Sequence, residues 1–348
     1  MTVTEEIERV KEELRKIQKN KATEHYIGNL KIRLSKLQSI STARKTGGKS
    51  FAVKKQGNAT VLLIGFPSVG KSTLLNKLTN AKSRTAAYEF TTLRPVPGMM
   101  IYKKAKIQII DAPGIISGAS IGKGGGKQIL SLAQGADLLL ILLDPEKNRI
   151  KTVIKELEES GIRINTLPPK VTIKKTERGG IVIDSTVRQD TDTKILRDIL
   201  RRFGYANAHI ILREKVTVGR FIDALSHRVY VKAVFAFNKC DTLNVSSLKK
   251  DYPNALFISA ITGKGLDELR ERLWRELELK QIYLKEPGKK ELGEPLIMKG
   301  KVKVKDVAKR VGNFKKAKVW GKSVKFGGQV VSMEHELADR DVVLFTKS

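Results

Sequence analysis

Residues 65–73, GFPSVGKST, are the part of the chain whose residue types and spacing most specifically indicate chemistry. A glycine, four variable residues and Gly-Lys-Ser follow the apolar run 59–64 directly and precede an apolar helical pattern over 74–78, which is the setting of a phosphate-binding loop. Glycines let backbone N–H groups turn toward a phosphate, and the following helix N-terminus adds partial positive charge. The segment predicts a nucleoside triphosphate site whose members are Gly65, Pro67, Ser68, Val69, Gly70, Lys71, Ser72 and Thr73.

Two of these side chains have specific expected roles. We expect Lys71 to pair with the β- and γ-phosphates, and the Ser72 hydroxyl to bind Mg²⁺. Asp111 ends the apolar run 107–110 and is expected to hold Mg²⁺ through water, while the N–H of Gly114 faces the γ-phosphate. The predicted metal ligands are therefore Ser72, Thr92 and Asp111, and the residues predicted to act in hydrolysis are Lys71, Thr92 and Gly114.

The loop before this strand contains Phe90, Thr91 and Thr92. A threonine hydroxyl there would complete the Mg²⁺ shell, and we assign this to Thr92. Phe90 and Thr91 are predicted to lie at the nucleotide, although ordinary turn hydrogen bonding is an equally good reading of Thr91.

The base is expected to be chosen by residues 238–241, NKCD, at the end of the predicted strand 233–237. The Asp241 carboxylate can accept hydrogen bonds from N1–H and the N2 amino group of guanine, whereas adenine lacks both donors in that arrangement. A buried acceptor left unpaired costs ~1–3 kcal/mol, so the segment predicts GTP and GDP, against the alternative of an ATPase with a relaxed base site. The predicted base site consists of Asn238, Lys239 and Asp241, with Ser259 and Ala260 supplying N–H groups to guanine O6.

The segment after Asp111 lacks an obvious group to orient the attacking water. Many GTPases have a glutamine just after the glycine of this motif, where this chain has Ile115, and residues 112–136 contain no Asp, Glu or His. We therefore expect slow intrinsic turnover, with the missing group supplied by an activating protein partner, a monovalent cation such as K⁺, or Gln128. The glycines of residues 122–126 favour an order–disorder switch, and a solvated loop tip is the alternative.

Taken in order, these segments resemble a GTPase of the translation-factor class. Residues 65–73, 88–93 (YEFTTL) and 111–119 (DAPGIISGA) are similar to developmentally regulated GTP-binding (DRG) proteins of the archaeal type, within the Obg-like GTPases. The resemblance covers nearly the whole chain and implies an N-terminal helix pair, an insert like domain 2 of ribosomal protein S5, and a C-terminal TGS domain of the β-grasp type. It also implies association with ribosomes and translation. Where some relatives bind potassium through an asparagine of the phosphate loop, this chain has Ser68.

The elements that must position these residues follow from hydrophobic periodicity. Apolar stripes over 5–19 and 27–37 predict two amphipathic helices, and four short apolar runs (59–64, 107–110, 138–143 and 233–237) predict parallel strands covered on both faces. The expected fold is an α/β P-loop GTPase domain with a helical hairpin, an inserted α+β subdomain and a β-grasp domain. The predicted boundaries are 1–57 for the hairpin and a basic linker, 58–162 and 232–282 for the GTPase domain, 163–231 for the insert, and 283–348 for the C-terminal domain.

The charge indicates a polyanionic partner. The 348 residues include 67 Lys and Arg against 36 Asp and Glu, a formal net charge of +31, although an organism that favours lysine on every surface is the alternative explanation. Between Lys299 and Lys318 nine cationic residues face one acid, Asp306. The alternation of lysine with valine over 299–305 predicts a half-buried strand whose lysines bind phosphates or only protect a sheet edge. With 6% aromatic residues, structured RNA is a better match than unpaired bases.

Composition excludes other classes of protein. A single cysteine excludes an intrachain disulfide framework, and the four histidines have no metal-ligand spacing. The longest apolar run, 138–143, is far short of a membrane span, and the N-terminus lacks a signal-peptide pattern, so we expect a cytoplasmic protein without membrane or DNA partners. The predicted function is a GTP-hydrolysing switch on the ribosome or structured RNA. The alternative is a nucleotide-gated RNA-binding or ribosome-assembly module in which hydrolysis only resets binding.

Overall fold

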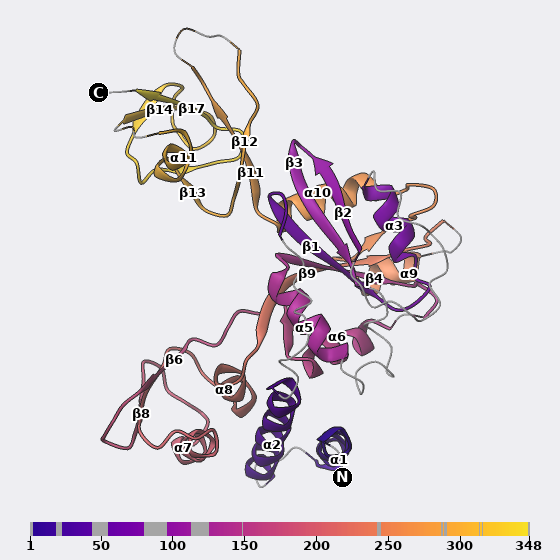
Figure 1. Ribbon diagram of the computed structural model, residues 1–348, viewed down its shortest axis with the longest axis vertical. Helices are drawn as coiled ribbons and strands as arrows, with labels where there is room; N and C mark the ends of the chain where they lie inside the picture. Colours follow the sequence, from indigo (N-terminus) through magenta and orange to yellow (C-terminus); the bar gives the residue numbers. More distant parts are fainter. Residues whose placement is uncertain are drawn as a thin grey trace. The chain divides into compact units, whose positions relative to one another are not determined.

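The structure is a computed structural model (Figure 1). It describes residues 3–18, 23–43, 55–79, 96–112, 125–147, 149–241, 245–286, 288, 291–312, 314 and 316–346. The chain forms two compact units. One comprises Met1–Phe51, Gly122–Leu130 and Leu157–Tyr230, and the other comprises Ala52–Ile121, Ser131–Glu156 and Val231–Ser348.

A mainly parallel sheet forms the centre of the second unit, with the strand order β10-β9-β4-β1-β3-β2. Its strands are β1 (Ala59–Gly65), β2 (Val96–Tyr102), β3 (Ala105–Asp111), β4 (Leu138–Leu143), β9 (Val229–Phe237) and β10 (Leu256–Phe257). The four predicted apolar runs are the strands β1, β3, β4 and β9, which run parallel to one another. Every residue of β1 and β4 is buried, as expected for strands covered on both faces. Strand β2 runs antiparallel to β3 at the sheet edge, and a seventh strand, β5 (Ile162–Ile164), pairs with β9 outside this order.

Helices α3 (Lys71–Leu78) and α10 (Leu266–Glu276) share one core with the sheet. Leu74 and Leu75 of α3 and Leu269 and Leu273 of α10 are fully buried there. The short helix α9 (Ser246–Asp251) precedes β10. Helices α5 (Gly125–Gly135) and α6 (Ile150–Glu159) flank β4 in sequence. This packing fixes the strand ends from which the predicted nucleotide segments project.

The C-terminal part of the second unit is a five-stranded sheet, β12-β11-β17-β14-β15, packed against one helix. Its elements are β11 (Leu279–Leu284), β12 (Leu296–Lys299), β14 (Lys316–Trp320), β15 (Gln329–Val331), β17 (Val342–Thr346) and helix α11 (Val304–Val311). A two-stranded sheet pairs β13 (Val302–Lys303) with β16 (Glu336–Leu337). The core contains side chains from both sheets and from α11.

The prediction of a single strand over residues 299–305 is wrong. Strand β12 ends at Lys299, β13 has only two residues, and α11 begins at Val304. The Asp306 carboxylate accepts a hydrogen bond from the Lys303 N–H at 3.0 Å, which caps the helix start. The lysines of this run therefore belong to a turn, a short strand and a helix, and they do not share one strand face.

The first unit combines the N-terminal helices with the insert, residues 171–225. Helix α1 (Val3–Lys16) packs on α2 (Glu24–Ala43) through Val10, Leu30 and Leu37. Another side of α2 packs on the insert helices, where Ile32 joins their core. The insert itself has helices α7 (Thr193–Arg202) and α8 (Val218–Leu225) on a sheet ordered β6-β8-β7, whose strands are Val171–Lys175, Ala208–Leu212 and Ile181–Ser185.

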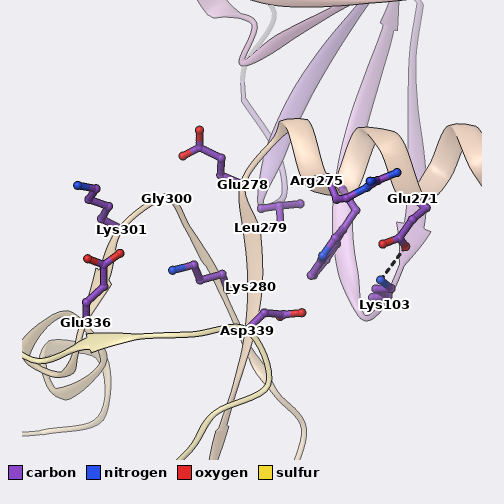
Figure 2. A pocket seen from close by; sticks show the side chains of 11 residues that line it. Lys103, Glu271, Arg275, Glu278, Leu279, Lys280, Gly300, Lys301, Glu336 and Asp339 are labelled. Atoms are coloured by element: carbon purple, nitrogen blue, oxygen red, sulfur yellow. Dashed lines mark hydrogen bonds and ion pairs between the residues drawn. The ribbon is translucent and has the colours of Figure 1, made fainter. Parts of the chain in front are cut away.

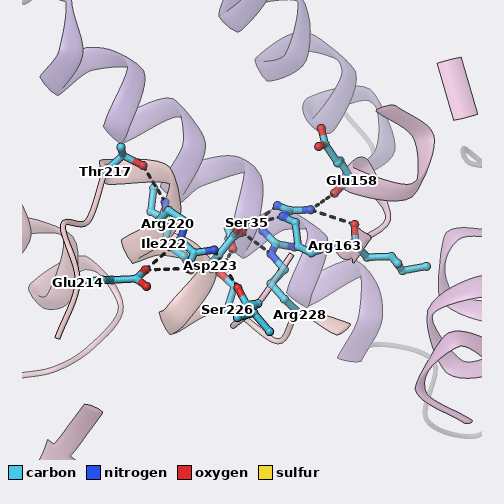
Figure 3. Close-up of polar contacts among 12 residues, drawn as sticks. Ser35, Glu158, Arg163, Glu214, Thr217, Arg220, Ile222, Asp223, Ser226 and Arg228 are labelled. Atoms are coloured by element: carbon cyan, nitrogen blue, oxygen red, sulfur yellow. Dashed lines mark hydrogen bonds and ion pairs between the residues drawn. The ribbon is translucent and has the colours of Figure 1, made fainter. Parts of the chain in front are cut away.

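One carboxylate holds the chain where it enters and leaves the insert (Figure 3). Asp223 accepts two 2.8 Å hydrogen bonds from Arg163, which lies in β5 (Ile162–Ile164), and a 3.0 Å bond from Arg228. Nearby, the hydroxyls of Ser35 in α2 and Ser226 lie 2.7 Å apart. Burial lowers the pKa of Arg228, and the positive charge of Arg163 adds to this effect. The two guanidinium groups therefore depend on Asp223 for compensation.

We predict that Asp223→Ala destabilises the first unit by about 3 kcal/mol, because it leaves the buried Arg228 charge without its partner. Chemical denaturation of the full chain, followed by far-ultraviolet circular dichroism, measures this loss. The matched control is Asp190→Ala, which breaks an exposed ion pair with Lys215 in the same insert and should cost less than ~0.5 kcal/mol. Equal losses in the two variants would contradict the role given to Asp223.

Candidate nucleotide-binding site

The predicted phosphate loop connects β1 to α3, at the carboxyl edge of the sheet. Gly70 has φ +92°, and a Cβ there would lie 2.4 Å from Nδ2 of Asn238, so both conformation and space require glycine. Gly65 faces a similar limit, since its Cβ would lie 2.5 Å from the carbonyl oxygen of Leu142 in β4. The loop thus folds tightly against its neighbours, with backbone N–H groups and the start of α3 at its mouth.

Lys71 spans the loop from the first turn of α3. Its Nζ donates 2.9 Å hydrogen bonds to the carbonyl oxygens of Gly65 and Phe66. An ammonium group has three donors, so one remains for a phosphate oxygen. Burial lowers the pKa of Lys71, and the nearby Asp111 carboxylate opposes this.

Ser72 and Asp111, two of the predicted metal ligands, meet beside the loop. The register of β3 on β1 sets Asp111 opposite Leu63, and the Ser72 hydroxyl donates to Asp111 Oδ2 at 3.2 Å. The other carboxylate oxygen, Oδ1, is buried and has no hydrogen-bond partner among the residues the structure describes. Burial raises the pKa of Asp111, with Lys71 and Ser72 opposing. A hydroxyl beside an unpaired carboxylate oxygen is a donor set that suits Mg²⁺.

Asn238 joins the phosphate loop to the predicted base site. This buried side chain donates from Nδ2 to the Val69 carbonyl at 2.8 Å and accepts on Oδ1 from the Ala260 N–H, also at 2.8 Å. Because both bonds are buried, the two loops form one rigid body around the amide. Ser259 and Ala260 lie directly beyond β10.

Asp241 is exposed, so its carboxylate is accessible to a ligand. A hydrogen bond from the Ser259 side chain lowers the pKa of Asp241, so the carboxylate is ionised at neutral pH. The neighbouring Cys240 is buried, and burial raises the pKa of its thiol. Cys240 therefore has a packing position.

Asp144 is a residue of this site that the sequence interpretation missed. It follows β4 and accepts a 3.0 Å bond from Nζ of Lys239 and a 3.1 Å bond from the Glu146 N–H. Burial alone would raise the pKa of Asp144, but these hydrogen bonds bring it below its usual range. A carboxylate directly after a fully buried strand, at the same edge as the other segments, was the available signal.

The predicted residues Phe90, Thr91, Thr92 and Gly114 lie outside the residues that the structure describes, as does Ile115. The structure thus brings together the phosphate loop, Asp111 and the base-site residues. Among the described residues no three His, Cys, Asp or Glu side chains are grouped to hold a metal ion. Within the same part of the chain, every helix is too short or too polar to cross a bilayer.

A separate pocket of about 540 Å³ lies where α10 meets β11 (Figure 2). Its walls carry both signs of charge, including Glu271 and Arg275 from α10 and Lys280 and Asp339 from the C-terminal part. Glu271 is already engaged by Lys103 at 2.7 Å. None of the predicted nucleotide-site residues lines this pocket.

Comparisons with known proteins agree with this geometry. Residues 60–175 match a family described as 50S ribosome-binding GTPase, and residues 178–279 match the C-terminal region of the MMR_HSR1 domain. An uncharacterised GTP-binding protein of Methanocaldococcus jannaschii is 46% identical over 99% of this chain and 92% of its own length. Developmentally-regulated G-protein 1 of Arabidopsis thaliana is 38% identical over 100% of this chain and 92% of its own. Ribosome-interacting GTPase 1 of Saccharomyces cerevisiae is 41% identical over 99% of both chains.

The Asn238 bridge gives a direct prediction. Asn238→Ala leaves the Val69 carbonyl and the Ala260 N–H unpaired, at ~1–3 kcal/mol each, and should weaken GDP binding at least tenfold. Isothermal titration measures the affinity. Asn207→Ala is the matched control, since Asn207 makes the same kind of paired backbone bonds, to Glu177 and Gly180, in an exposed turn of the insert. Unchanged GDP affinity in Asn238→Ala would contradict the bridging role.

Proposed function

The chain belongs to the family of developmentally regulated GTP-binding proteins, and from this premise we propose that it is a GTP-hydrolysing molecular switch that associates with the ribosome. The observation that carries the nucleotide part is the Asn238 amide, which fixes the phosphate loop to the loop that ends in Ser259 and Ala260. This bridge sets the base-reading carboxylate Asp241 at a constant position relative to Lys71. The site therefore has a phosphate end and a base end held at one spacing.

Each end of the site has a defined chemical task. Lys71 and the loop N–H groups bind the β- and γ-phosphates, while Ser72 and Asp111 would hold Mg²⁺, with Thr92 as the proposed third ligand. When bound, Mg²⁺ supplies positive charge to the β- and γ-phosphate oxygens. At the other end Asp241 accepts from guanine N1–H and N2, and Asp144 holds Lys239 for contact along the base.

Hydrolysis depends on orienting a water molecule, and the chain is poorly equipped for this step. Residues 112–136 contain no Asp, Glu or His, so no carboxylate or imidazole of that segment can act as a base. The rate then comes from positioning by Lys71 and by the proposed Gly114 N–H. We propose slow turnover that rises when a protein partner, a monovalent cation such as K⁺, or Gln128 supplies the missing group.

The parts outside the GTPase domain are proposed to contact the partner. We assign residues 1–57 to a helical hairpin and linker, 163–231 to an S5-like insert and 283–348 to a TGS domain of the β-grasp type. Supporting the last assignment, a five-stranded sheet packs on the single helix α11. Supporting the first two, α2 packs on both insert helices, so that hairpin and insert form one unit.

The ribosome is the proposed partner for two reasons. The formal net charge of +31 favours a large polyanion, and one relative that shares the full length of this chain is named a ribosome-interacting GTPase. The proposed location is the cytoplasm. The second candidate function is a ribosome-assembly or RNA-binding module in which hydrolysis only resets binding. The absence of Asp, Glu and His from residues 112–136 favours it, and negligible turnover in the presence of ribosomes would select it.

Guanine specificity is tested by Asp241→Asn. An asparagine offers one acceptor and one donor, so it cannot accept from both guanine groups, and GTP affinity should fall by ~1–3 kcal/mol, about 5- to 150-fold. Affinity for inorganic pyrophosphate, which reports the phosphate end alone, should stay constant. Asp267→Asn, an exposed aspartate in the first turn of α10, is the control and should bind GTP normally. Unchanged GTP affinity in Asp241→Asn would defeat the base-reading assignment.

Switch behaviour is tested by sedimentation with ribosomes. The chain loaded with a non-hydrolysable GTP analogue should sediment with ribosomes, and the GDP-loaded chain should be released at the same ionic strength. Phosphate release should be slow for the chain alone and faster with ribosomes. Equal ribosome occupancy in the two nucleotide states would contradict a switch, and no sedimentation in either state would contradict ribosome association.

A further inference from the structure

The C-terminal sheet has one covered face and one open face. Ile282, Ala317, Val319, Val343 and Phe345 are buried on the covered face, where the α11 side chains complete the core. Side chains alternate along a strand, so the neighbours of these residues point to the opposite side of the sheet. Gln281 of β11 and Ile297 of β12 also lie on that side but are buried, Ile297 in the core of the main sheet. We name the other part of this side the open sheet face and define it as Tyr283, Lys285, Lys316, Lys318, Trp320, Val330, Val342, Leu344 and Thr346.

The strand register sets these side chains in rows across the sheet. Val342 lies between Tyr283 and Trp320 in one row. In the next, Lys318 lies between Leu344 and Val330, and in the third Lys316 lies beside Thr346. The result is an apolar centre with lysines in two adjoining rows. Val330 keeps 58% of its surface exposed.

Charge on the open sheet face is of one sign. Its nine members include three lysines and no aspartate or glutamate. Lys316 and Lys318 are exposed, and among the residues that the structure describes neither has an ion pair. The β14–β15 connection carries the exposed Lys322 and Lys325, while its Val324 packs against the covered core.

Three of the four lysines in the run 299–305, which the sequence favoured for phosphate binding, are paired with carboxylates. Lys303 and Lys305 both bind Glu334, at 2.7 and 2.5 Å, and these two hydrogen bonds lower the pKa of Glu334 to about 2. Lys299 binds Asp137 at 2.7 Å. A phosphate at these positions would have to compete with a carboxylate that stays ionised at every physiological pH.

The indole of Trp320 is not free for aromatic stacking. Trp320 lies against Gly327 and Gly328, where added Cβ atoms would be 2.7 and 3.2 Å from the indole. The ammonium of Lys285 lies 4.9 Å from the ring centroid. With its indole engaged in this way, Trp320 anchors the β14–β15 connection and leaves the lysines as the recognising groups.

We propose that the open sheet face binds the phosphate backbone of base-paired RNA, with Lys316 and Lys318 as the principal contacts. The inference rests on the proposed association with the ribosome and names the surface that makes it. Lysine contacts to phosphates carry no sequence information, so binding should depend on RNA shape and salt concentration, with little dependence on sequence. With three lysines and no acidic side chain among its members, the face is complementary to the uniform negative charge of a phosphate backbone.

The test compares two pairs of lysines in the full chain loaded with the GTP analogue. K316Q/K318Q removes two charges that have no ion pair among the described residues, and K303Q/K305Q removes two charges that are paired with Glu334. Binding to a 20-base-pair RNA duplex and to ribosomes is measured over a series of salt concentrations. K316Q/K318Q should weaken both at least tenfold and reduce the slope of log K against log salt by about 1.4–1.8, whereas K303Q/K305Q should change affinity less than threefold.

Further arms separate the possible reasons for failure. K316R/K318R keeps the charge and should bind as the unmodified chain does, while unchanged thermal unfolding and GTP affinity in every variant exclude misfolding. An unmodified chain that binds neither duplex nor ribosome overturns the proposed function and this inference together. Binding by the unmodified chain that K316Q/K318Q retains with the same salt slope overturns the inference alone. Loss of ribosome binding with duplex binding intact assigns the face to a ribosomal protein and also overturns it.

Discussion

The parallel run of β1, β3, β4 and β9 is the constraint on which the site depends. Parallel strands end at the same edge of a sheet, so the segments after β1, β3 and β9 meet although they are separated by up to 173 residues of sequence, from Gly65 to Asn238. The strand register then sets the position of Asp111. This last residue of β3 lies opposite Leu63, two residues before Gly65 of the phosphate loop, and its carboxylate accepts a hydrogen bond from Ser72. Only after these placements can one amide, that of Asn238, span the gap between the loops. The depth of burial of β1 and β4 keeps the arrangement rigid.

Much of this site could be predicted because its sequence motifs determine the local backbone conformation. Gly70 and Asn238 are both required by one contact, in which the Asn238 side-chain amide lies against the phosphate loop. Both residues could be recognised from the spacing of residues within their motifs. Asp144 could not be recognised in this way, because its role comes from β4 lying beside β9, which brings it to Lys239. Its position directly after a buried strand was the only available signal, and that position does not identify Lys239 as its partner.

The fold shows the same division. The apolar stripe of α2 predicted the contact of Leu30 and Leu37 with α1, but Ile32 and Ser35, on other sides of that helix, pack on the insert, a partner that the local pattern does not indicate. Over residues 299–305 the alternation of lysine and valine indicated a strand, and the capping carboxylate of Asp306 decided for a helix start at Val304. The alternation of lysine and valine over seven residues therefore did not determine the structure. The helix cap at Asp306 and the two-residue pairing of β13 with β16 did.

The packing of Trp320 has a consequence for spectroscopy. The chain contains two tryptophans, Trp320 under the β14–β15 connection and Trp274 buried in α10 against the main sheet, and both belong to the second unit. Intrinsic tryptophan emission is therefore silent about the N-terminal helices and the insert. The indole of Trp320, with Lys285 above it and Lys318 in the adjoining row, is a natural fluorophore at the edge of a charged surface, and Trp274 is its internal reference. Replacing Trp274 with phenylalanine would isolate a signal from that surface without attaching a dye.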